Sequence, residues 1–395
     1  MRKQYDLLLR GARVVDPAQQ LDGRYDLGVR AGKVAAIAPT LATADAAQVI
    51  ELTGQVLIPG IIDSHVHVAG ARAVGLRMVA RAGVTTAIDF SSRMEELLAA
   101  VRAQGLVVNV GGLHPISPGI TVPDADPGYD LLREELSKAL RAGSLGLKIP
   151  GGHNPLTPEA TARVIQVANE EQVYVAFHVG TTATGSNLHG LLEVEQLLGR
   201  EGRLHVAHVN SYCRGLVADP VEEAMQALAM LQRLRGRVVS ESYLGTINGT
   251  SGRCTGGVPV SHVTRNCLRM RGYPPTEAGL EAALRDGYGH VYVERGGEMV
   301  LVSGEEAWEL WRRANTKVGV SFPVNSPQAT FLMATTRDSQ GSFVVDAIST
   351  DGGAIPRNVM VERGLALVRY GALSLAEFVE KVSTAPAAMF ALAQK

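Results

Sequence analysis

The sequence predicts an α/β fold: a (β/α)8 barrel of the TIM type, with a small N-terminal β-domain and an insertion over the barrel mouth. Strand-like apolar runs alternate with amphipathic helix-like segments from residue 56 to about 243, which is typical of a parallel sheet. Several of these runs end in a polar residue followed by a Gly- or Asn-containing loop, as catalytic strand ends of barrels do. The intervals from Lys148 to His178 and from His178 to His208 are each 30 residues, about one βα unit.

Each part of the chain has its own pattern. Residues 1–55 alternate in short strands with turns at Gly11, Gly32 and Gly54, which predicts the small β-domain. The barrel is expected over 56–395, with helices at 93–104, 130–142, 157–171, 189–199, 220–234, 359–370 and 373–393. Thr157 is the expected cap of its helix, with Pro158 in the first turn. Residues 244–325 break the rhythm and contain a hairpin pattern at 286–303, so they are predicted to form the insertion.

Composition excludes several classes of protein. The hydrophobic fraction of 46% is ordinary for a globular enzyme, and the net charge of −1 gives no sign of a nucleic-acid partner. No apolar run approaches the roughly 18 residues of a membrane span. Three cysteines, an odd and small number in a chain of this length, argue against a disulfide framework. We therefore expect a cytoplasmic protein with no membrane partner.

The segment Asp63-Ser-His65-Val-His67 is the most informative motif. It closes an apolar strand-like run, and residues at positions i and i+2 of a strand point to the same side. Two converging imidazoles make up much of a zinc or iron site, although two half-buried histidines at a strand end would give the same pattern. Four further strand-like runs end in residues able to serve such a site: Lys148, His178, His208 and Asp351.

This combination, in this order, resembles the amidohydrolase superfamily, the metal-dependent hydrolases that include dihydroorotase, hydantoinase and the N-acyl-D-amino-acid deacylases. Residues 5–16 and 27–37 resemble the family's β-domain, and residues 55–63 resemble its entry into the barrel. Family members usually continue past a segment such as 387–395 into strands that complete the β-domain. A half-built β-domain and a sequence that continues further both stay open.

The resemblance implies one or two divalent metal ions, with zinc expected. His65, His67 and Asp351 would bind the first, and His178 and His208 the second. Lys148, carbamylated by CO2, would bridge them, since a cationic ammonium beside two metal ions is strongly repelled. A lysine paired with an acid at the barrel rim is the alternative.

The resemblance also implies hydrolysis of an amide C–N bond by metal-activated water, with Asp351 as the general base and then the general acid. A small-molecule N-acyl amino acid is the expected substrate, as for D-aminoacylases and D-glutamate deacylases, because of the histidine spacing, Glu241-Ser-Tyr243 and the long insertion. Candidate substrate contacts are Tyr243, Asn210, Arg253 and Arg357, each of which could equally be structural. His205 is expected to face away from the barrel axis.

Two other functions stay open. A cyclic-amide hydrolase of the dihydroorotase or hydantoinase type is favoured by Lys148. A metal-free barrel acting as a binding or structural protein would be expected to have lost ligands, and here all are present. Association into a homo-oligomer is left open.

Overall fold

The computed structural model describes residues 3–69 and 74–392. The chain forms two compact units, Met1–Ile61 with Leu365–Lys395, and Ile62–Gly364. The boundary expected between residues 55 and 56 stays a prediction. All residues proposed for the site belong to the second unit.

The first unit contains a five-stranded sheet of order β3-β2-β1-β4, with β5 also pairing with β1. Its strands are β1 Tyr5–Asp16, β2 Leu21–Arg30, β3 Lys33–Ala38, β4 Ala46–Glu51 and β5 Val56–Leu57. The neighbours of β1 run in both directions, since β2 is antiparallel to it while β4 and β5 are parallel. Gly11, at φ +72°, lies at an irregularity of β1 between Leu9 and Ala12, where its backbone conformation favours glycine. The short helices α13 Leu375–Val379 and α14 Ala385–Met389 flank a π-helical turn, and α13 contacts β1.

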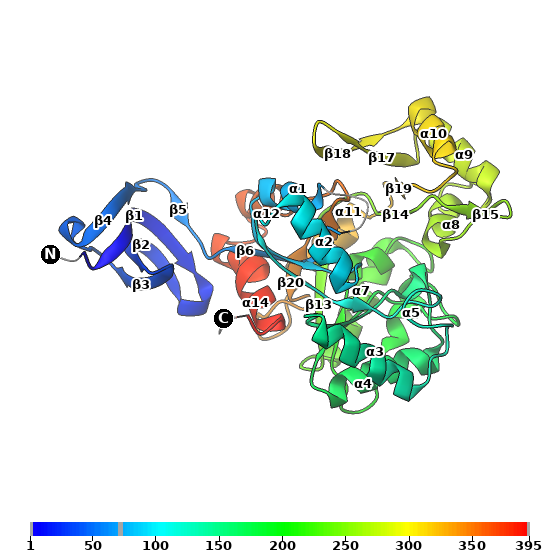
Figure 1. Ribbon diagram of the computed structural model, residues 1–395, viewed down its shortest axis with the longest axis horizontal. Helices are drawn as coiled ribbons and strands as arrows, with labels where there is room; N and C mark the ends of the chain where they lie inside the picture. The colour runs from blue at the N-terminus through cyan, green and yellow to red at the C-terminus, as the bar shows by residue number, and fades with distance from the viewer. Residues whose placement is uncertain (1–2, 70–73, 393–395) are drawn as a thin grey trace. The chain divides into compact units, whose positions relative to one another are not determined.

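The second unit is built on two parallel sheets of order β21-β6-β7-β8 and β20-β13-β12-β11-β10-β9 (Figure 1). Their strands are β6 Ile61–His67, β7 Val84–Asp89, β8 Asn109–Gly112, β9 His114–Pro115, β10 Gly146–Ile149, β11 Tyr174–Phe177, β12 Leu204–Val206, β13 Val238–Tyr243, β20 Ala347–Ser349 and β21 Gly352–Gly353.

The chain passes from one sheet to the other at both edges. Leu113 alone separates β8 from β9, and Thr350 and Asp351 separate β20 from β21. The sequence predicted a single closed barrel, whereas the described parallel strands of this unit form two separate sheets. At the second joint Asp351 has φ +47°, a left-handed conformation that interrupts the extended ladder.

Helices follow the strands as the alternation predicted. They are α1 Gly75–Arg81, α2 Met94–Gln104, α3 Tyr129–Arg141, α4 Pro158–Glu170, α5 Leu188–Leu192, α6 Val194–Leu197, α7 Pro220–Arg233, α11 Pro327–Thr335 and α12 Met360–Arg369. The expected start of α4 is confirmed, since the Thr157 hydroxyl accepts a hydrogen bond from Ala160 N at 3.1 Å and Pro158 occupies the first turn. The helix expected over 189–199 is two short helices that meet at Glu193.

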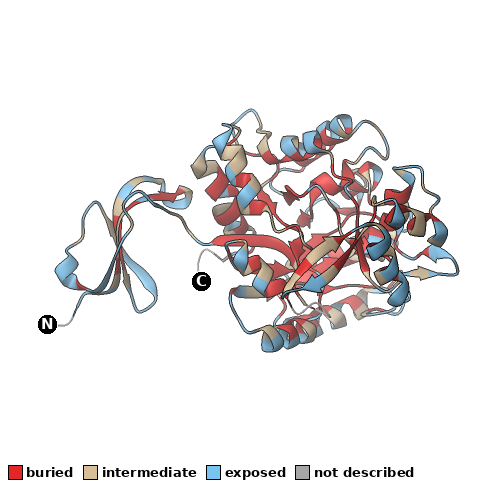
Figure 2. Cartoon of the chain, turned by 90° about the horizontal axis from the view of Figure 1, so that it is seen from above, coloured by how far each residue is buried: buried red, intermediate tan, exposed pale blue. Residues whose placement is uncertain are grey.

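The core of this unit lies between strands and helices. Val175, Phe177, Leu204 and Val206 from the strands are buried with apolar residues of α3, α4 and α7. Figure 2 shows the strands as buried and the outer faces of the helices as exposed. Successive residues of a strand point to opposite faces of the sheet, so the residues that alternate with these apolar ones point away from the helices.

Residues between β13 and α11 form a separately packed insertion. Its elements are β14 Thr250–Ser251, β15 Cys254–Thr255, β16 Val258–Pro259, α8 His262–Arg269, α9 Glu277–Arg285, β17 His290–Arg295, β18 Glu298–Val302, α10 Gly304–Arg313 and β19 Gly319–Ser321. The predicted hairpin is β17–β18, and the fully buried Trp311 lies in the insertion's own core. Helix α8 contacts the 3₁₀ turn after β10, and Tyr292 and Met299 pack with Ala354, which follows β21. The insertion therefore lies against the C-terminal ends of the strands.

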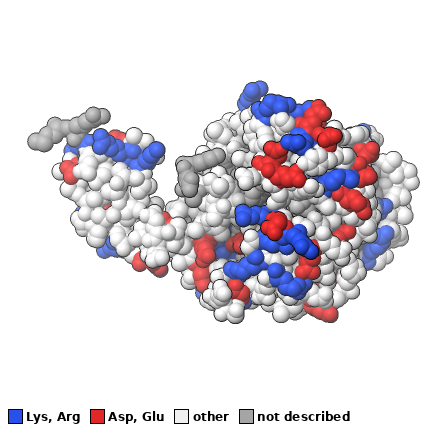
Figure 3. Space-filling model, turned by 90° about the horizontal axis from the view of Figure 1, so that it is seen from below, with Lys and Arg blue, Asp and Glu red and all other residues white. Residues whose placement is uncertain are grey.

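The face seen in Figure 3 has no large patch of a single charge, because acidic and basic side chains are interspersed over the larger unit. This agrees with the net charge of −1. No helix in the described ranges is both long and apolar enough to cross a membrane.

Candidate metal centre

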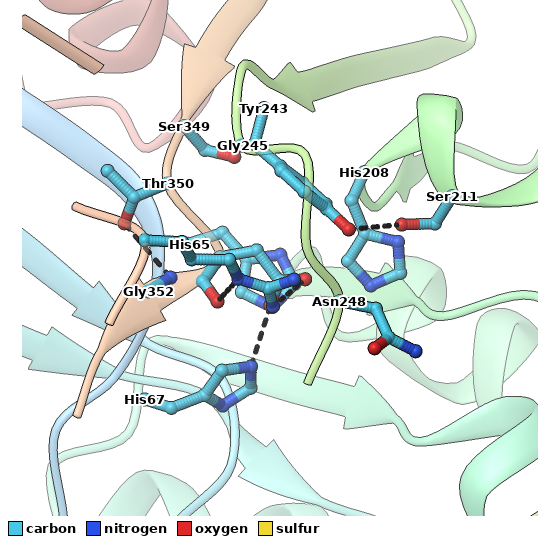
Figure 4. Close-up of polar contacts among 12 residues, drawn as sticks. His65, His67, His208, Ser211, Tyr243, Gly245, Asn248, Ser349, Thr350 and Gly352 are labelled. Atoms are coloured by element: carbon cyan, nitrogen blue, oxygen red, sulfur yellow. Dashed lines mark hydrogen bonds and ion pairs between the residues drawn. The ribbon is translucent and has the colours of Figure 1, made fainter. Parts of the chain in front are cut away.

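The first ligand group consists of His65, His67 and Asp351, whose ligand atoms all lie within 4.8 Å of one another. The two histidines, labelled in Figure 4, come from the end of β6. Asp351 lies in the joint between β20 and β21. Asp351 Oδ1 lies 2.8 Å from His67 Nε2 and 3.4 Å from His65 Nε2. The strand alternation that the sequence suggested thus brings both imidazoles to one carboxylate.

Glu241 fixes the orientation of His65. Its Oε1 lies 2.8 Å from His65 Nδ1 and accepts from His208 N at 2.8 Å, while Oε2 accepts from the Ser349 hydroxyl at 2.5 Å. The carboxylate is fully buried. Because the Nδ1 edge is held in this way, Nε2 of His65 is turned toward Asp351, which is how an outer carboxylate orients a metal-binding histidine.

The second ligand group consists of His178 and His208, which follow β11 and β12. His178 Nδ1 lies 3.0 Å from His208 Nε2, and both rings are buried. His178 Nε2 lies 2.5 Å from the Ser186 hydroxyl, which in turn donates to Val179 O. The His65 and His208 rings stack with centroids 5.0 Å apart, so the two groups are neighbours.

Lys148 lies on β10 close to both groups. Its Nζ is buried, has no hydrogen-bond partner among the described residues, and lies 4.9 Å from the centroid of Phe90, which stacks on His65. Burial lowers the pKa of Lys148 to about 7, although Glu241 and Asp351 act in the opposite direction. The acid pairing considered as an alternative is absent for Lys148 in the described part of the chain.

Two of the candidate ligands have left-handed backbone conformations, His208 at φ +35° and Asp351 at φ +47°. Such conformations cost energy in residues other than glycine and concentrate at functional sites. Asp63 holds the turn at Asp351 in place. Its carboxylate accepts hydrogen bonds from Thr350 N at 3.0 Å and from the Thr350 hydroxyl at 2.5 Å.

Arg357 pairs with Asp351. Its Nη2 lies 2.5 Å from Asp351 Oδ2, its Nε donates to Asp351 O at 2.6 Å, and its Nη1 donates to Ile247 O at 3.2 Å. Burial acts to raise the pKa of Asp351, but Arg357 and the neighbouring histidines outweigh it and hold the pKa well below its usual range. The guanidinium thus contacts Oδ2 of Asp351, whereas the two histidines contact Oδ1.

The other proposed substrate contacts lie at different distances from the centre. The buried Tyr243 has its ring centroid 6.4 Å from that of His208. Asn210 accepts from Tyr243 N at 3.1 Å, and its buried Nδ2 has no hydrogen-bond partner within residues 3–69 and 74–392. Arg253 is exposed, and no described hydrogen bond or ion pair of its side chain reaches the ligand groups.

The donor set fits divalent metal ions. Neutral imidazoles and a carboxylate are the ligands that zinc and similar ions prefer, and they converge here from separate strand ends. The His178–His208 contact at 3.0 Å is an ordinary hydrogen bond between neutral imidazoles, whereas the buried amine of Lys148 has no hydrogen-bond partner among the described residues and calls for an explanation.

Several known proteins are similar to this chain in sequence or in fold. No family model matches the chain. A dihydroorotase of Syntrophus aciditrophicus is 45% identical over 62 residues, 15% of this chain and 15% of that protein. A D-aminoacylase of Alcaligenes xylosoxydans xylosoxydans is 26% identical over 239 residues, 50% of this chain and 48% of that protein. The matches thus span half or less of these relatives' lengths.

In fold, the chain is similar to an N-acyl-D-glutamate deacylase from Bordetella bronchiseptica, solved with zinc and a phosphonate inhibitor. The TM-score is 0.71 at 17% identity, over 100% of this chain and 87% of that one. The predicted resemblance to the amidohydrolase superfamily is confirmed.

The orientation of one histidine near the ligand groups was predicted wrongly. His205 was expected to face away from the barrel axis, but its Nε2 lies 3.8 Å from Glu241 and its ring 5.5 Å from Phe90. The prediction assumed that strand alternation continues from His205 to His208. Strand β12 ends at Val206, however, and His208 has a left-handed conformation, so the alternation does not reach it. His205 Nδ1 lies 2.9 Å from the Tyr174 hydroxyl.

Sequence reasoning also missed the contacts of Glu241 and Ser186 to the ligand groups. Glu241 was noted only as part of a family motif, and a buried glutamate inside a strand was the available signal. Ser186 lies in the loop between β11 and α5, where the sequence has no distinguishing pattern.

Proposed function

We propose that the chain is a metal-dependent amidohydrolase that removes the acyl group from N-acyl amino acids. The observation that carries the proposal is the meeting of two ligand groups, His65–His67–Asp351 and His178–His208, whose rings stack at 5.0 Å. The 26% identical D-aminoacylase supports the amide-hydrolase class. We also propose that the two parallel sheets are the two parts of one (β/α)8 barrel. Residues 109–115 form an edge of both sheets through β8 and β9, and residues 347–353 do so through β20 and β21.

The metal ions, which we expect to be zinc, would be held by the first and the second ligand group. Bound there, such an ion polarises an amide carbonyl and lowers the pKa of a water to about 7.

Lys148 completes the second site in this proposal. Its amine lacks any hydrogen-bond acceptor in the described structure, and a buried ammonium without a counterion is costly. The neutral amine forms an N–C bond to CO2 and releases one proton, which leaves an anionic carbamate. This carbamate would supply the charge that two imidazoles do not.

The remaining residues position groups and move a proton. Asp351 takes the proton of the attacking water and returns it to the leaving nitrogen as the C–N bond breaks. Arg357 holds that carboxylate from the opposite side, and Glu241 fixes the His65 ring. The insertion limits access of bulk water from above the strand ends.

A cyclic-amide hydrolase is the second candidate. It is favoured by the lysine on β10 and by the 62-residue similarity to dihydroorotase. Both candidates use the same metal centre and differ in whether the substrate amide is open or in a ring.

Metal analysis and a substrate screen test the proposal together. Protein purified after growth with zinc should carry one to two zinc ions per chain, and His67→Ala should lower both metal content and turnover. N-acyl-D- and L-amino acids should be hydrolysed faster than hydantoins or dihydroorotate. A metal-free wild-type protein would refute the enzyme proposal, and faster turnover of the cyclic amides would establish the second candidate.

A further inference from the structure

Among the described residues, Arg214 is hydrogen-bonded to neutral partners only. Its Nε donates to Asn325 Oδ1 at 2.8 Å, and its Nη2 donates to the hydroxyls of Ser211 and Tyr243, each at 3.1 Å. No ion pair of Arg214 and no hydrogen bond of its Nη1 occurs within the described ranges. A half-buried guanidinium is therefore held in one orientation with one edge unused.

The hydrogen-bond partners of Arg214 lie at the C-terminal ends of the strands or in the loops that follow them. Ser211 belongs to the 3₁₀ helix Val209–Tyr212 directly after His208, Tyr243 ends β13, and Asn325 lies between the insertion and α11. The hydroxyl of Tyr243 is 3.1 Å from Ser211 Oγ, and Figure 4 shows it directed toward Ser211, beside His208.

Tyr243 separates two arginines with different surroundings. The Arg357 guanidinium lies 4.4 Å from the centroid of the Tyr243 ring and is neutralised by Asp351. Arg214 contacts the hydroxyl end of the same ring, and no carboxylate of the described residues pairs with its charge. An arginine held as a planar fork binds a carboxylate through two parallel hydrogen bonds, and little side-chain entropy remains to be lost.

We infer that Arg214 is the anion-binding residue of this site and that the substrate carries a carboxylate which meets its Nη1 edge. The identity of the substrate as an N-acyl compound rests on the proposed function. The presence of an anion site at Arg214 does not.

Binding of a non-hydrolysable pair tests the inference. In 4-oxopentanoate a CH2 replaces the amide nitrogen of N-acetylglycine, and its methyl ester lacks the charge. Titration calorimetry of the zinc-loaded protein should show tighter binding of the acid than of the ester. Arg214→Met should weaken binding of the acid by about 10- to 100-fold, as for loss of a charged hydrogen-bonded pair, and leave the ester within about threefold.

Arg237→Met is the matched control. Arg237 is also half-buried and bonded to neutral oxygens, those of Gly199 and Gly202, but it precedes β13 at the opposite strand end. This variant should bind both probes as wild type does. Arg214→Lys should keep a preference for the acid with weaker affinity, and it decides the matter if Arg214→Met does not fold by circular dichroism.

The outcomes separate the two proposals. Equal binding of acid and ester by the wild type, or an undiminished preference for the acid in Arg214→Met, overturns the anion site. So does unchanged affinity for the acid in a folded Arg214→Lys. If the acid preference depends on Arg214 but no N-acyl amino acid is hydrolysed, the proposed function fails and the anion site stands.

Discussion

The two ligand groups are built differently. The first contains its own carboxylate, Asp351, and is held by two charged side chains, Glu241 and Arg357. The second consists of two imidazoles; the His178 ring contacts the neutral hydroxyl of Ser186, and Glu241 reaches this group only through the backbone N–H of His208. The first group therefore contains an anionic ligand of its own, whereas the second contains none, and in the proposed function Lys148 would supply it.

The largest expected effect follows from Asp351→Asn. The substitution is nearly isosteric but removes proton transfer, so we expect turnover to fall by about 10²–10⁴-fold or more while the fold is kept. Steady-state kinetics with zinc analysis measures this. Near-normal turnover in a folded variant would move the proton-carrying role to another residue.

Lys148→Ala should affect the second group alone. Without the carbamate we expect the protein to lose one metal ion and most activity, and propionate should restore part of both by standing in for the carbamate. Zinc content measured with and without propionate checks the prediction. Retention of the full metal content without propionate would show that the second group needs no anion.

Glu241→Gln and Ser186→Ala compare the outer contacts of the two groups. Loss of an outer contact typically weakens metal binding by about 10–100-fold, and Glu241→Gln should show this because it weakens a charged contact to His65. Ser186→Ala should weaken it less, because its contact to His178 is neutral. Competition with a zinc chelator measures both affinities. A larger loss of zinc affinity in Ser186→Ala than in Glu241→Gln would contradict the view that the charged contact matters more than the neutral one.

Thr157→Ala should change neither group. It removes the cap of α4, so the free energy of unfolding should fall by about 1 kcal/mol while kcat/KM stays constant. Urea denaturation and kinetics on the same sample separate stability from chemistry. A parallel loss of metal would mean that α4 and the site unfold together.

Much of this site could be predicted because its residues terminate strands. Strand alternation brings His65 and His67 to one side, and the βα spacing places His178 and His208 on consecutive strands. Contacts over long separations in sequence could not be obtained in this way. The pairing of His65 with Glu241, 176 residues away, depends on how the sheets assemble. Backbone turns were equally hidden, since nothing in the sequence marks His208 as left-handed, and the inward direction of His205 was missed for that reason.

Anomalous diffraction at the zinc edge, from crystals of protein grown with zinc, tests the central claim most directly. We expect one peak among His65, His67 and Asp351, a second between His178 and His208, and density for a carbamate on Lys148. A bare lysine beside a single metal ion, or no peak at either group, would contradict the account.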